Sequence, residues 1–219
     1  MSDIRAVIFD LDGVITDTAE YHYRAWQRLA DELDIPFDRT ANEQFRGVGR
    51  LDCLRLLLDG RPVADFDELA ERKNAYYVGL LANVTPHDIL PGAAELIAEL
   101  RAARVKIAIG SVSKNTWTVL RGLGLDKSFD AVVDGTMITR SKPDPEVFAK
   151  AAQLLGVPPA RCLVIEDAAA GVEAGKAAGM MTLGIGPVSR VGHADAVVDN
   201  LAGVTWGKLR KLMSVDAHA

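Results

Sequence analysis

The chain has 219 residues, of which 49% are hydrophobic and 25% are charged, and its formal net charge is -5. These values are typical of a soluble globular protein, either one large domain or a core with a smaller insert. The charges are interspersed, without the long Lys/Arg cluster that marks a nucleic-acid surface, and no apolar run approaches the roughly 20 residues of a membrane helix.

The two cysteines, Cys53 and Cys162, lie far apart in apolar contexts. We interpret them as reduced core residues rather than as a disulfide framework or a metal site. We expect no secretory signal peptide, because the chain passes from Ser2 and Asp3 directly into a strand. These features predict a cytoplasmic protein with neither nucleic-acid nor membrane partners. The oligomeric state leaves no signal in the sequence, and we expect a monomer.

The first predicted element is a strand from Ala6 to Phe9, an apolar run of the kind that is buried on both faces. Asp10 and Asp12 follow it, ahead of Gly13. In an open parallel sheet, ligands bind at the carboxyl ends of the strands. Two acids placed there can divide nucleophilic attack and proton transfer between them. However, Asp-Gly is also a common turn pair, so this stretch alone leaves both interpretations open.

A helical pattern follows a polar hinge at Thr16 to Thr18. From Ala19 to Leu33 the apolar residues recur at helical spacing, and His22 and Trp26 share one face. By position alone, we favour a core role for His22. Further helices are predicted at about Asn42 to Arg46, Leu51 to Leu58 and Asp65 to Leu81. Together they form an all-helical insert after the first strand.

Two places in this insert carry cations. The loop Gly47-Val48-Gly49-Arg50 separates two helices, and Arg50 could bind a phosphate through its guanidinium fork. A plain connection with a solvated arginine is the more frequent case. Lys73 lies between Arg72 and Asn74 in the long helix, where a surface charge is the default interpretation.

Strand and helix alternate after Val84 to Asp88. A helix opens after Pro91-Gly92, and the next buried strand runs from Val105 to Ile109. Small and polar residues then lead into a helix that reaches Leu123; they include Ser111, Ser113, Lys114 and Asn115. A serine at a strand end ahead of a helix N-terminus favours an anion site, although Ser113 could simply cap the helix, and both can hold.

The rest of the chain continues the alternation. A short strand is predicted from Ala131 to Val133, and Pro145 begins a helix by local rules, which leaves Lys142 either solvated or directed inward. The apolar strand from Cys162 to Ile165 stops at Glu166 and Asp167. Asp167 could serve only as the N-cap of the helix from Ala168 to Ala178. The remaining predicted elements are strands at Met181 to Ile185 and Ala196 to Val198 and a helix near Trp206 to Leu212.

Polar groups therefore follow several strands of the predicted parallel sheet, along one edge. They are Asp10 and Asp12, Ser111, Lys142, and Glu166 with Asp167. Carboxylate ligands with no His or Cys nearby suit magnesium rather than zinc. Magnesium, a lysine and a hydroxyl are suited to a transferring phosphoryl group, whose charge must be neutralised as a carboxylate approaches it.

In this order, the same residues resemble the four motifs of the haloacid dehalogenase superfamily: Asp10-x-Asp12-Gly13-Val14, Ser111, Lys142-Pro143 and Glu166-Asp167. The resemblance spans essentially the whole chain. It implies an α/β fold, with a Rossmann-like parallel sheet in a catalytic core at residues 1–15 and 87–219. It also implies a small all-helical cap at residues 16–86. The two crossings, Thr16 to Thr18 and Val84 to Asp88, should act as hinges.

Within the superfamily, the chain most resembles phosphomutases that interconvert β-glucose 1-phosphate and glucose 6-phosphate through β-glucose 1,6-bisphosphate. The likeness is carried by residues 9–22, Trp26, residues 42–50, Arg72-Lys73-Asn74 and Ser111-x-Ser113-Lys114-Asn115. It implies that Asp10 becomes the aspartyl phosphate and that Asp12 moves protons at the sugar oxygens. Ser111 and Lys142 would hold the transferring phosphoryl group. Mg²⁺ would bind Asp10, the backbone carbonyl of Asp12, Glu166 and Asp167.

The same resemblance implies a substrate site between cap and core. Its members would be His22, Trp26, Gly47, Val48, Arg50 and Lys73 from the cap, and Ser113, Lys114 and Asn115 from the core. His22 and Lys73 would link substrate binding to Asp12. Gly49 and Cys53 stand where relatives often carry serine, so the contacts to the sugar, and with them the hexose, stay open.

Two other functions compete with the mutase. A phosphatase for a small sugar phosphate or phosphoglycolate would use the same motifs, and a sugar-phosphate-binding module would have lost catalysis. Arg50 and Lys114 offer cations to a far phosphate, which favours the mutase. The presence of every catalytic carboxylate disfavours the binding module.

Overall fold

The computed structural model describes residues 4–214. Its centre is a six-stranded parallel sheet in the order β3-β2-β1-β4-β5-β6. The strands are β1 (Ala6–Phe9), β2 (Lys106–Gly110), β3 (Ala131–Val133), β4 (Cys162–Glu166), β5 (Met181–Ile185) and β6 (Ala196–Val198). Because β1 lies between β2 and β4, the strand order reverses at this point, where doubly wound sheets bind ligands. The prediction of a Rossmann-like parallel sheet is confirmed.

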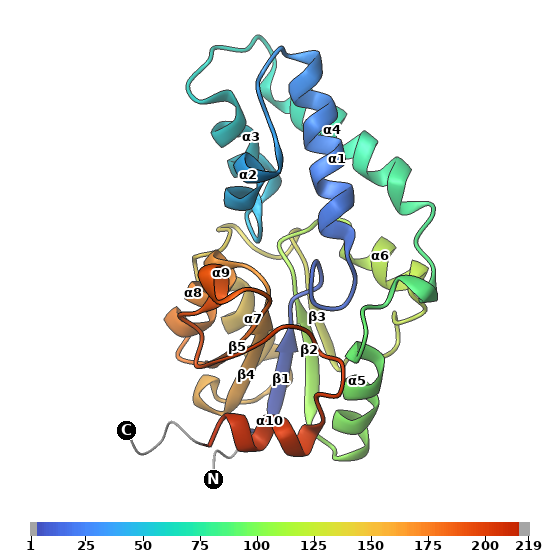
Figure 1. The fold of residues 1–219 in the computed structure, drawn as a ribbon, viewed down its shortest axis with the longest axis vertical. Helices are drawn as coiled ribbons and strands as arrows, with labels where there is room; N and C mark the ends of the chain where they lie inside the picture. The colour runs from blue at the N-terminus through green and yellow to red at the C-terminus, as the bar shows by residue number, and fades with distance from the viewer. Residues whose placement is uncertain (1–3, 215–219) are drawn as a thin grey trace.

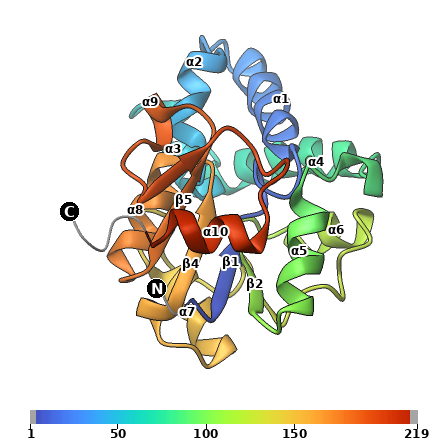
Figure 2. The ribbon, with the colours of Figure 1, turned by 60° about the horizontal axis from the view of Figure 1, so that its bottom comes forward.

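Helices cover both faces of the sheet. One face carries α5 (Ala93–Ala102), α6 (Thr116–Gly122) and α10 (Trp206–Leu212), and the other carries α7 (Glu146–Leu155) and α8 (Ala169–Ala177). Side chains alternate along a strand, so Val7 and Phe9 enter one core while Ala6 and Ile8 enter the other. Figure 2 shows α10 crossing the sheet beside α5.

A helical body stands over the carboxyl ends of the strands (Figure 1). It consists of α1 (Thr18–Glu32), α2 (Arg39–Asn42), the 3-10 helix η1 (Glu43–Phe45), α3 (Arg50–Leu58) and α4 (Phe66–Leu81). These helices enclose an apolar core of their own around Trp26, Leu29 and Leu54. The inserted helical cap is therefore present, and its separate core explains how an insertion can fold without disturbing the sheet.

The other predicted elements have ends within one residue of those observed, with one exception. In place of a helix from Asn42 to Arg46, α2 ends at Asn42 and η1 follows, so that Arg46 is extended. Three short elements have no counterpart in the prediction: η2 (Pro86–Asp88), η3 (Pro159–Arg161) and α9 (Val188–Val191). Within residues 4–214, no helix combines the length and apolar character needed to cross a bilayer.

The chain passes between the two bodies twice, and the two crossings touch. Thr16 pairs with Ile89 in an isolated bridge, and the Leu90 N–H donates to the Ile15 carbonyl at 2.8 Å. These contacts support our proposed boundaries, a cap at residues 16–86 and a core at residues 1–15 and 87–219. The first three and last five residues of that core lie outside the described part of the chain.

Candidate active site

The middle of the sheet brings three strand ends together. Phe9 is in register with Ile109 on one side and Ile165 on the other, so the residues that follow these three strands share one edge. The Asp10 N–H donates to the Ile165 carbonyl at 2.9 Å, which extends the ladder by one residue. Asp10 and Ser111 are both buried at this edge. The strand order thus assembles the predicted row of polar groups.

Lys142 lies beneath the row and is directed inward. Its side chain is fully buried, and Nζ lies 2.6 Å from Asp10 Oδ1 and 2.6 Å from Glu166 Oε1. The interpretation as a solvated loop lysine is therefore wrong. Burial lowers the pKa of Lys142, but the two carboxylates outweigh it and raise the pKa above its usual value. Lys142 is a fixed positive charge at the end of β1.

Three carboxylates next to this lysine could hold a cation. Asp10, Glu166 and Asp167 are all buried, and each offers an oxygen such that these atoms lie within 4.8 Å of one another. Burial raises the pKa of Asp10 well above its ordinary value and that of Asp167 to about 7, with repulsion from Glu166 adding to both. The three carboxylates offer only oxygen ligands, and their negative charges repel one another. Such a set of ligands fits a hard divalent cation such as Mg²⁺. A ligand role for the Asp12 carbonyl stays a prediction.

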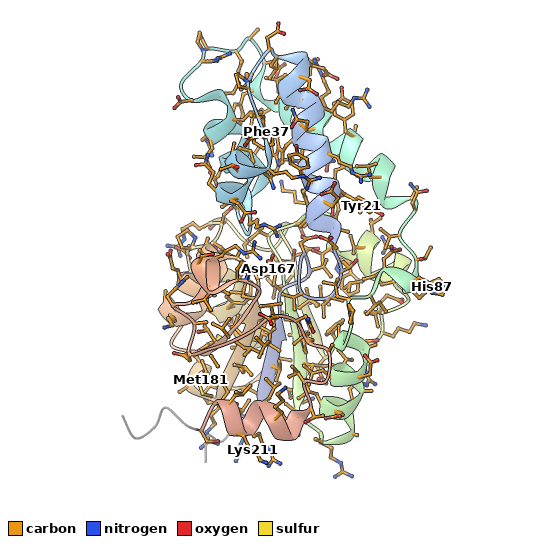
Figure 3. All side chains as sticks on the ribbon, viewed as in Figure 1. Tyr21, Phe37, His87, Asp167, Met181 and Lys211 are labelled. Atoms are coloured by element: carbon orange, nitrogen blue, oxygen red, sulfur yellow. The ribbon has the colours of Figure 1, made fainter. Side chains whose placement is uncertain are left out.

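Asp167 has no role as a helix cap, because the residue at the N-cap of α8 is Ala168, with no side-chain cap hydrogen bond. Figure 3 places Asp167 where the core faces the cap. Gly13 packs directly against it: the glycine has φ of +86°, and a Cβ there would collide with the Asp167 carboxylate. The motif therefore requires glycine both for its backbone and for the space above it.

The second carboxylate of the motif has a different environment. Thr18 Oγ1 donates to Asp12 Oδ1, whereas Oδ2 faces the His22 Nε2 atom at 4.0 Å. Burial raises the pKa of Asp12, and the hydrogen bond from Thr18 opposes this effect. Oδ2 is thus the oxygen available for proton exchange, next to Asp10 but outside its ion pair with Lys142.

The cap supplies a histidine–lysine pair. Lys73 Nζ lies 2.8 Å from His22 Nδ1 and 4.7 Å from the ring centre of Trp26. Lys73 is 1% exposed, so its interpretation as a surface charge is wrong. Burial lowers its pKa to about 7. When Lys73 is protonated it can only donate to Nδ1, and the His22 proton then lies on Nε2, towards Asp12. His22 lines the cavity between cap and core, so the core role favoured by its position is wrong.

A cavity of about 350 Å³ separates the cap from the core. The predicted site residues that line it are Asp10, Asp12, His22, Trp26, Gly47, Val48, Arg50, Lys73, Ser111, Ser113, Lys114, Asn115 and Asp167. Lys142 and Glu166 do not line it; Lys142 contacts Asp10 and Glu166 contacts Lys142. The structure therefore brings the predicted catalytic and substrate residues to one place.

Arg50 enters the cavity from the start of α3. Its Nη2 atom is held by Glu71 Oε1 at 2.8 Å, while Nη1 is buried without a hydrogen-bond partner in the described residues. An unpaired guanidinium N–H is costly to bury, and this N–H is free to donate a hydrogen bond to a bound anion. Across the cavity, the Asn115 side chain from the core donates to Asn74 Oδ1 of the cap at 2.9 Å.

Sequence reasoning missed a second set of contacts between cap and core. Arg46 Nη1 lies 2.8 Å from Asp167 Oδ2, and Arg190 of α9 donates to the Asp167 carbonyl at 2.7 Å. Glu43 bridges the two arginines, at 3.3 Å from Arg46 and 3.2 Å from Arg190. Arg46 directly precedes the predicted substrate loop at Gly47, and this position could have indicated that Arg46 also lies at the site. Nothing in the sequence around Arg190 indicates this contact.

These groups define an enzyme site suited to phosphoryl chemistry, with a carboxylate, a buried lysine and acidic cation ligands under a cap. The pattern of the haloacid dehalogenase-like hydrolases matches residues 4–179, and the chain belongs to that family. It is 44% identical to the β-phosphoglucomutase of Bacillus subtilis, over 92% of each chain. It is also 32% identical to a fructose-1-phosphate phosphatase of Escherichia coli, over 80% of this chain and 92% of that protein.

Solved structures give the same family. The crystal structure of β-phosphoglucomutase from Clostridium difficile superposes with a TM-score of 0.92 at 38% identity, covering 96% of this chain and 97% of that one. The similarity thus includes the helical cap as well as the sheet. The fold class is therefore an α/β core with an inserted helical cap, as in that enzyme.

Proposed function

We propose that the chain is a phosphomutase that interconverts β-D-glucose 1-phosphate and D-glucose 6-phosphate. The reaction would pass through β-glucose 1,6-bisphosphate and an aspartyl-phosphate form of the enzyme. The observation that carries this proposal is the buried Nη1 of Arg50 in the cap cavity, which has no hydrogen-bond partner among residues 4–214. A hydrolase needs only the phosphate that it cleaves. A mutase must also hold the phosphate at the far end of the sugar, and Arg50 offers a cation for it.

Each core residue then has a role. Asp10 attacks the phosphoryl group and becomes the aspartyl phosphate, while Lys142, already paired with Asp10, stabilises the charge of the group in transfer. Ser111 donates a hydrogen bond to the phosphoryl oxygens. Asp12 gives a proton to the departing sugar oxygen and takes one from the attacking hydroxyl. When bound by Asp10, the Asp12 carbonyl, Glu166 and Asp167, Mg²⁺ supplies further charge neutralisation.

The cap residues hold the sugar. Gly47, Val48 and Arg50 of the cap line the same cavity as Ser113, Lys114 and Asn115 of the core. With a cation for each end, Lys142 at Asp10 and Arg50 with Lys114 at the far phosphate, a glucose bisphosphate would bind in either direction. That symmetry is what a mutase needs, since its intermediate must present each phosphate in turn to Asp10.

Replacement of Arg50 by alanine tests the proposal. The far phosphate carries nearly two negative charges, and binding of this remote group can drive cap closure, alignment of Asp12 and exclusion of water. Loss of such a buried charged contact costs about 2–5 kcal/mol. We therefore expect Arg50→Ala to slow mutase turnover by roughly 30-fold or more. Hydrolysis of the aspartyl phosphate should be spared, because water needs no far phosphate.

The measurement is the ratio of glucose 6-phosphate formed to phosphate released, with β- and with α-glucose 1-phosphate and a bisphosphate primer. Arg24→Ala is the matched control, because Arg24 is an exposed cap arginine that pairs with Glu20 on its own helix. An unchanged ratio in Arg50→Ala would contradict the mutase. Wild-type protein that releases mainly phosphate would favour a sugar-phosphate phosphatase, as in the Escherichia coli relative.

From the acidic cluster of Asp10, Glu166 and Asp167 we predict that activity depends on Mg²⁺. Activity should disappear in excess chelator and return when Mg²⁺ is added, because the three buried carboxylates would hold the Mg²⁺ that helps to neutralise the phosphoryl group in transfer. Zn²⁺ should restore it poorly, since no His or Cys belongs to the cluster. Activity and Mg²⁺ binding by calorimetry are measured together. Full turnover in chelated, metal-free protein would rule out the assignment.

A further inference from the structure

Glu71 of α4 has no part in the roles above, although it binds the arginine that the cap places in the cavity. Glu71 Oε1 accepts a hydrogen bond from Arg50 Nη2 at 2.8 Å, which joins α4 to the start of α3. The Arg50 side chain is 19% exposed, whereas that of Glu71 is 66% exposed. An ion pair with so exposed an acid adds little to stability. The consequence of this contact therefore lies in the orientation of Arg50.

The contact determines which nitrogen of Arg50 is left for a ligand. The guanidinium is a rigid planar fork, so an acid that holds Nη2 also fixes the direction of Nη1. Nη1 is the buried atom without a hydrogen-bond partner in residues 4–214, and Arg50 lines the cavity. Glu71 itself does not line the cavity. It thus occupies one half of the fork and leaves the other half to donate to an anion.

The second oxygen of Glu71 is linked to the core. Asn74 lies three residues later on α4, and its Nδ2 atom donates to Glu71 Oε2 at 3.5 Å. Asn74 Oδ1 accepts in turn from the side chain of Asn115 at 2.9 Å, and Asn115 belongs to the core, directly ahead of α6. Each side chain therefore has a matching donor or acceptor at each contact. Asn115, Asn74, Glu71 and Arg50 form a polar row from the core, through α4, to α3.

We propose that Glu71 is a positioning residue for Arg50, and that Asn74 and Asn115 couple this role to the contact between cap and core. Glu71 holds the guanidinium with Nη1 towards the far phosphate of the substrate. The row is complete when the cap meets the core, because Asn115 is its core member. The proposal rests on the role of Arg50 in the proposed function. It makes selection of a second phosphate depend on an acid that the substrate does not touch.

A positioning effect of Glu71 and an effect of its charge have opposite signs. Glu71 is an anion near the place proposed for the far phosphate, so as a charge alone it repels the substrate. Its removal should then tighten binding. As a positioning residue it does the reverse: without it, Arg50 can adopt several rotamers, and the substrate must order this side chain when it binds. The direction in which affinity changes therefore separates the two effects.

The variant is Glu71→Ala, which removes both contacts and leaves a good helix former at an exposed position. We expect KM for β-glucose 1-phosphate, with a bisphosphate primer, to rise about fivefold, the effect of one more side chain ordered on binding. The kcat should stay within about twofold, because saturating substrate draws the guanidinium into place. Glu71→Gln keeps one oxygen for Arg50 and should lie between wild type and Glu71→Ala.

A direct binding measurement accompanies the kinetics. Asp10→Asn protein binds glucose 1,6-bisphosphate without the nucleophile needed to turn it over, and calorimetry gives its affinity. Adding Glu71→Ala to this background should weaken binding by about fivefold as well. Phosphorylation of Asp10 by acetyl phosphate should keep its wild-type rate in Glu71→Ala, because this donor has no far phosphate. In that reaction a bond from phosphorus to Asp10 forms, and acetate leaves with its electron pair and needs no proton.

Glu68→Ala is the matched control. It removes the same charge three residues earlier on α4, where Glu68 pairs with Arg72 at 2.8 Å, and it should leave KM unchanged. Glu71→Ala should have no further effect in protein that already carries Arg50→Ala, because Glu71 acts only through that arginine. Asn74→Ala should raise KM in the same direction by a smaller factor.

Two results would overturn the proposal: an unchanged or lowered KM in Glu71→Ala, or an undiminished effect of Glu71→Ala in protein without Arg50. Wild-type protein that releases mainly phosphate would contradict the proposed function instead. The calorimetric comparison with the bisphosphate would then still decide the role of Glu71, because it measures binding and not turnover.

Discussion

Asp10→Asn is expected to abolish phosphoryl transfer while leaving the protein folded. Asparagine has nearly the same shape as aspartate but no anionic oxygen to attack phosphorus, so the covalent intermediate cannot form. By analogy with other enzymes that lose a nucleophile, turnover should fall by roughly 10⁴-fold or more. The change also removes one of the two carboxylates that bind Lys142 Nζ at 2.6 Å. Glu166 still pairs with that lysine, so we expect a folded variant of reduced stability.

The measurement has two parts. Mass spectrometry after incubation with acetyl phosphate should detect the phosphoprotein in the wild type and not in Asp10→Asn, and circular dichroism should give equal helix content for both. Asp12→Asn separates the two carboxylates: it should still accept a phosphoryl group from acetyl phosphate and fail to pass it to a sugar. Substantial turnover in folded Asp10→Asn would show that another residue attacks.

Lys142→Met should have the second largest effect, on stability as well as on activity. Methionine matches the length of the stem but leaves Asp10 and Glu166 as two buried carboxylates without their shared cation. Removing one partner of a buried ion pair costs about 3–5 kcal/mol, because the remaining charge is uncompensated. Catalysis should be lost too, since the phosphoryl group in transfer meets two anions and no ammonium.

Denaturant unfolding at neutral pH measures this cost. Lys106→Met is the control: Lys106 is an exposed lysine that pairs with Asp130 at 3.0 Å, and the loss of such a surface pair costs about 1 kcal/mol or less. Added Mg²⁺ should restore part of the stability of Lys142→Met, because a cation at the carboxylates offsets their repulsion. Equal stability losses in the two variants would show that Lys142 has no special role in the core.

The sequence was most informative about the strands and about the residues that directly follow them. β1, β3, β5 and β6 are found at the predicted bounds, because buried parallel strands are short apolar runs flanked by turns. Once the strands were located, parallel pairing placed the residues after them along one edge. Local rules left Lys142 and Asp167 open, and the family resemblance was needed to assign their roles.

Contacts between cap and core were harder to predict. The burial of Lys73 depends on α1 packing beside α4, which the helical period of α4 does not reveal. Arg46 and Arg190 both contact Asp167, and this requires η1 and α9 to lie close together. These two short elements are more than 140 residues apart in sequence.

The touching crossings at Thr16 and Ile89 also bear on how such a family can diversify. The segment that leaves the sheet and the segment that returns to it are joined by backbone contacts, so the ends of the insertion stay adjacent whatever lies between them. Any helical body with neighbouring termini could be spliced in at this point while the strands and their acids keep their positions. A mutase and phosphatases can then share one sheet and differ in what the insertion carries.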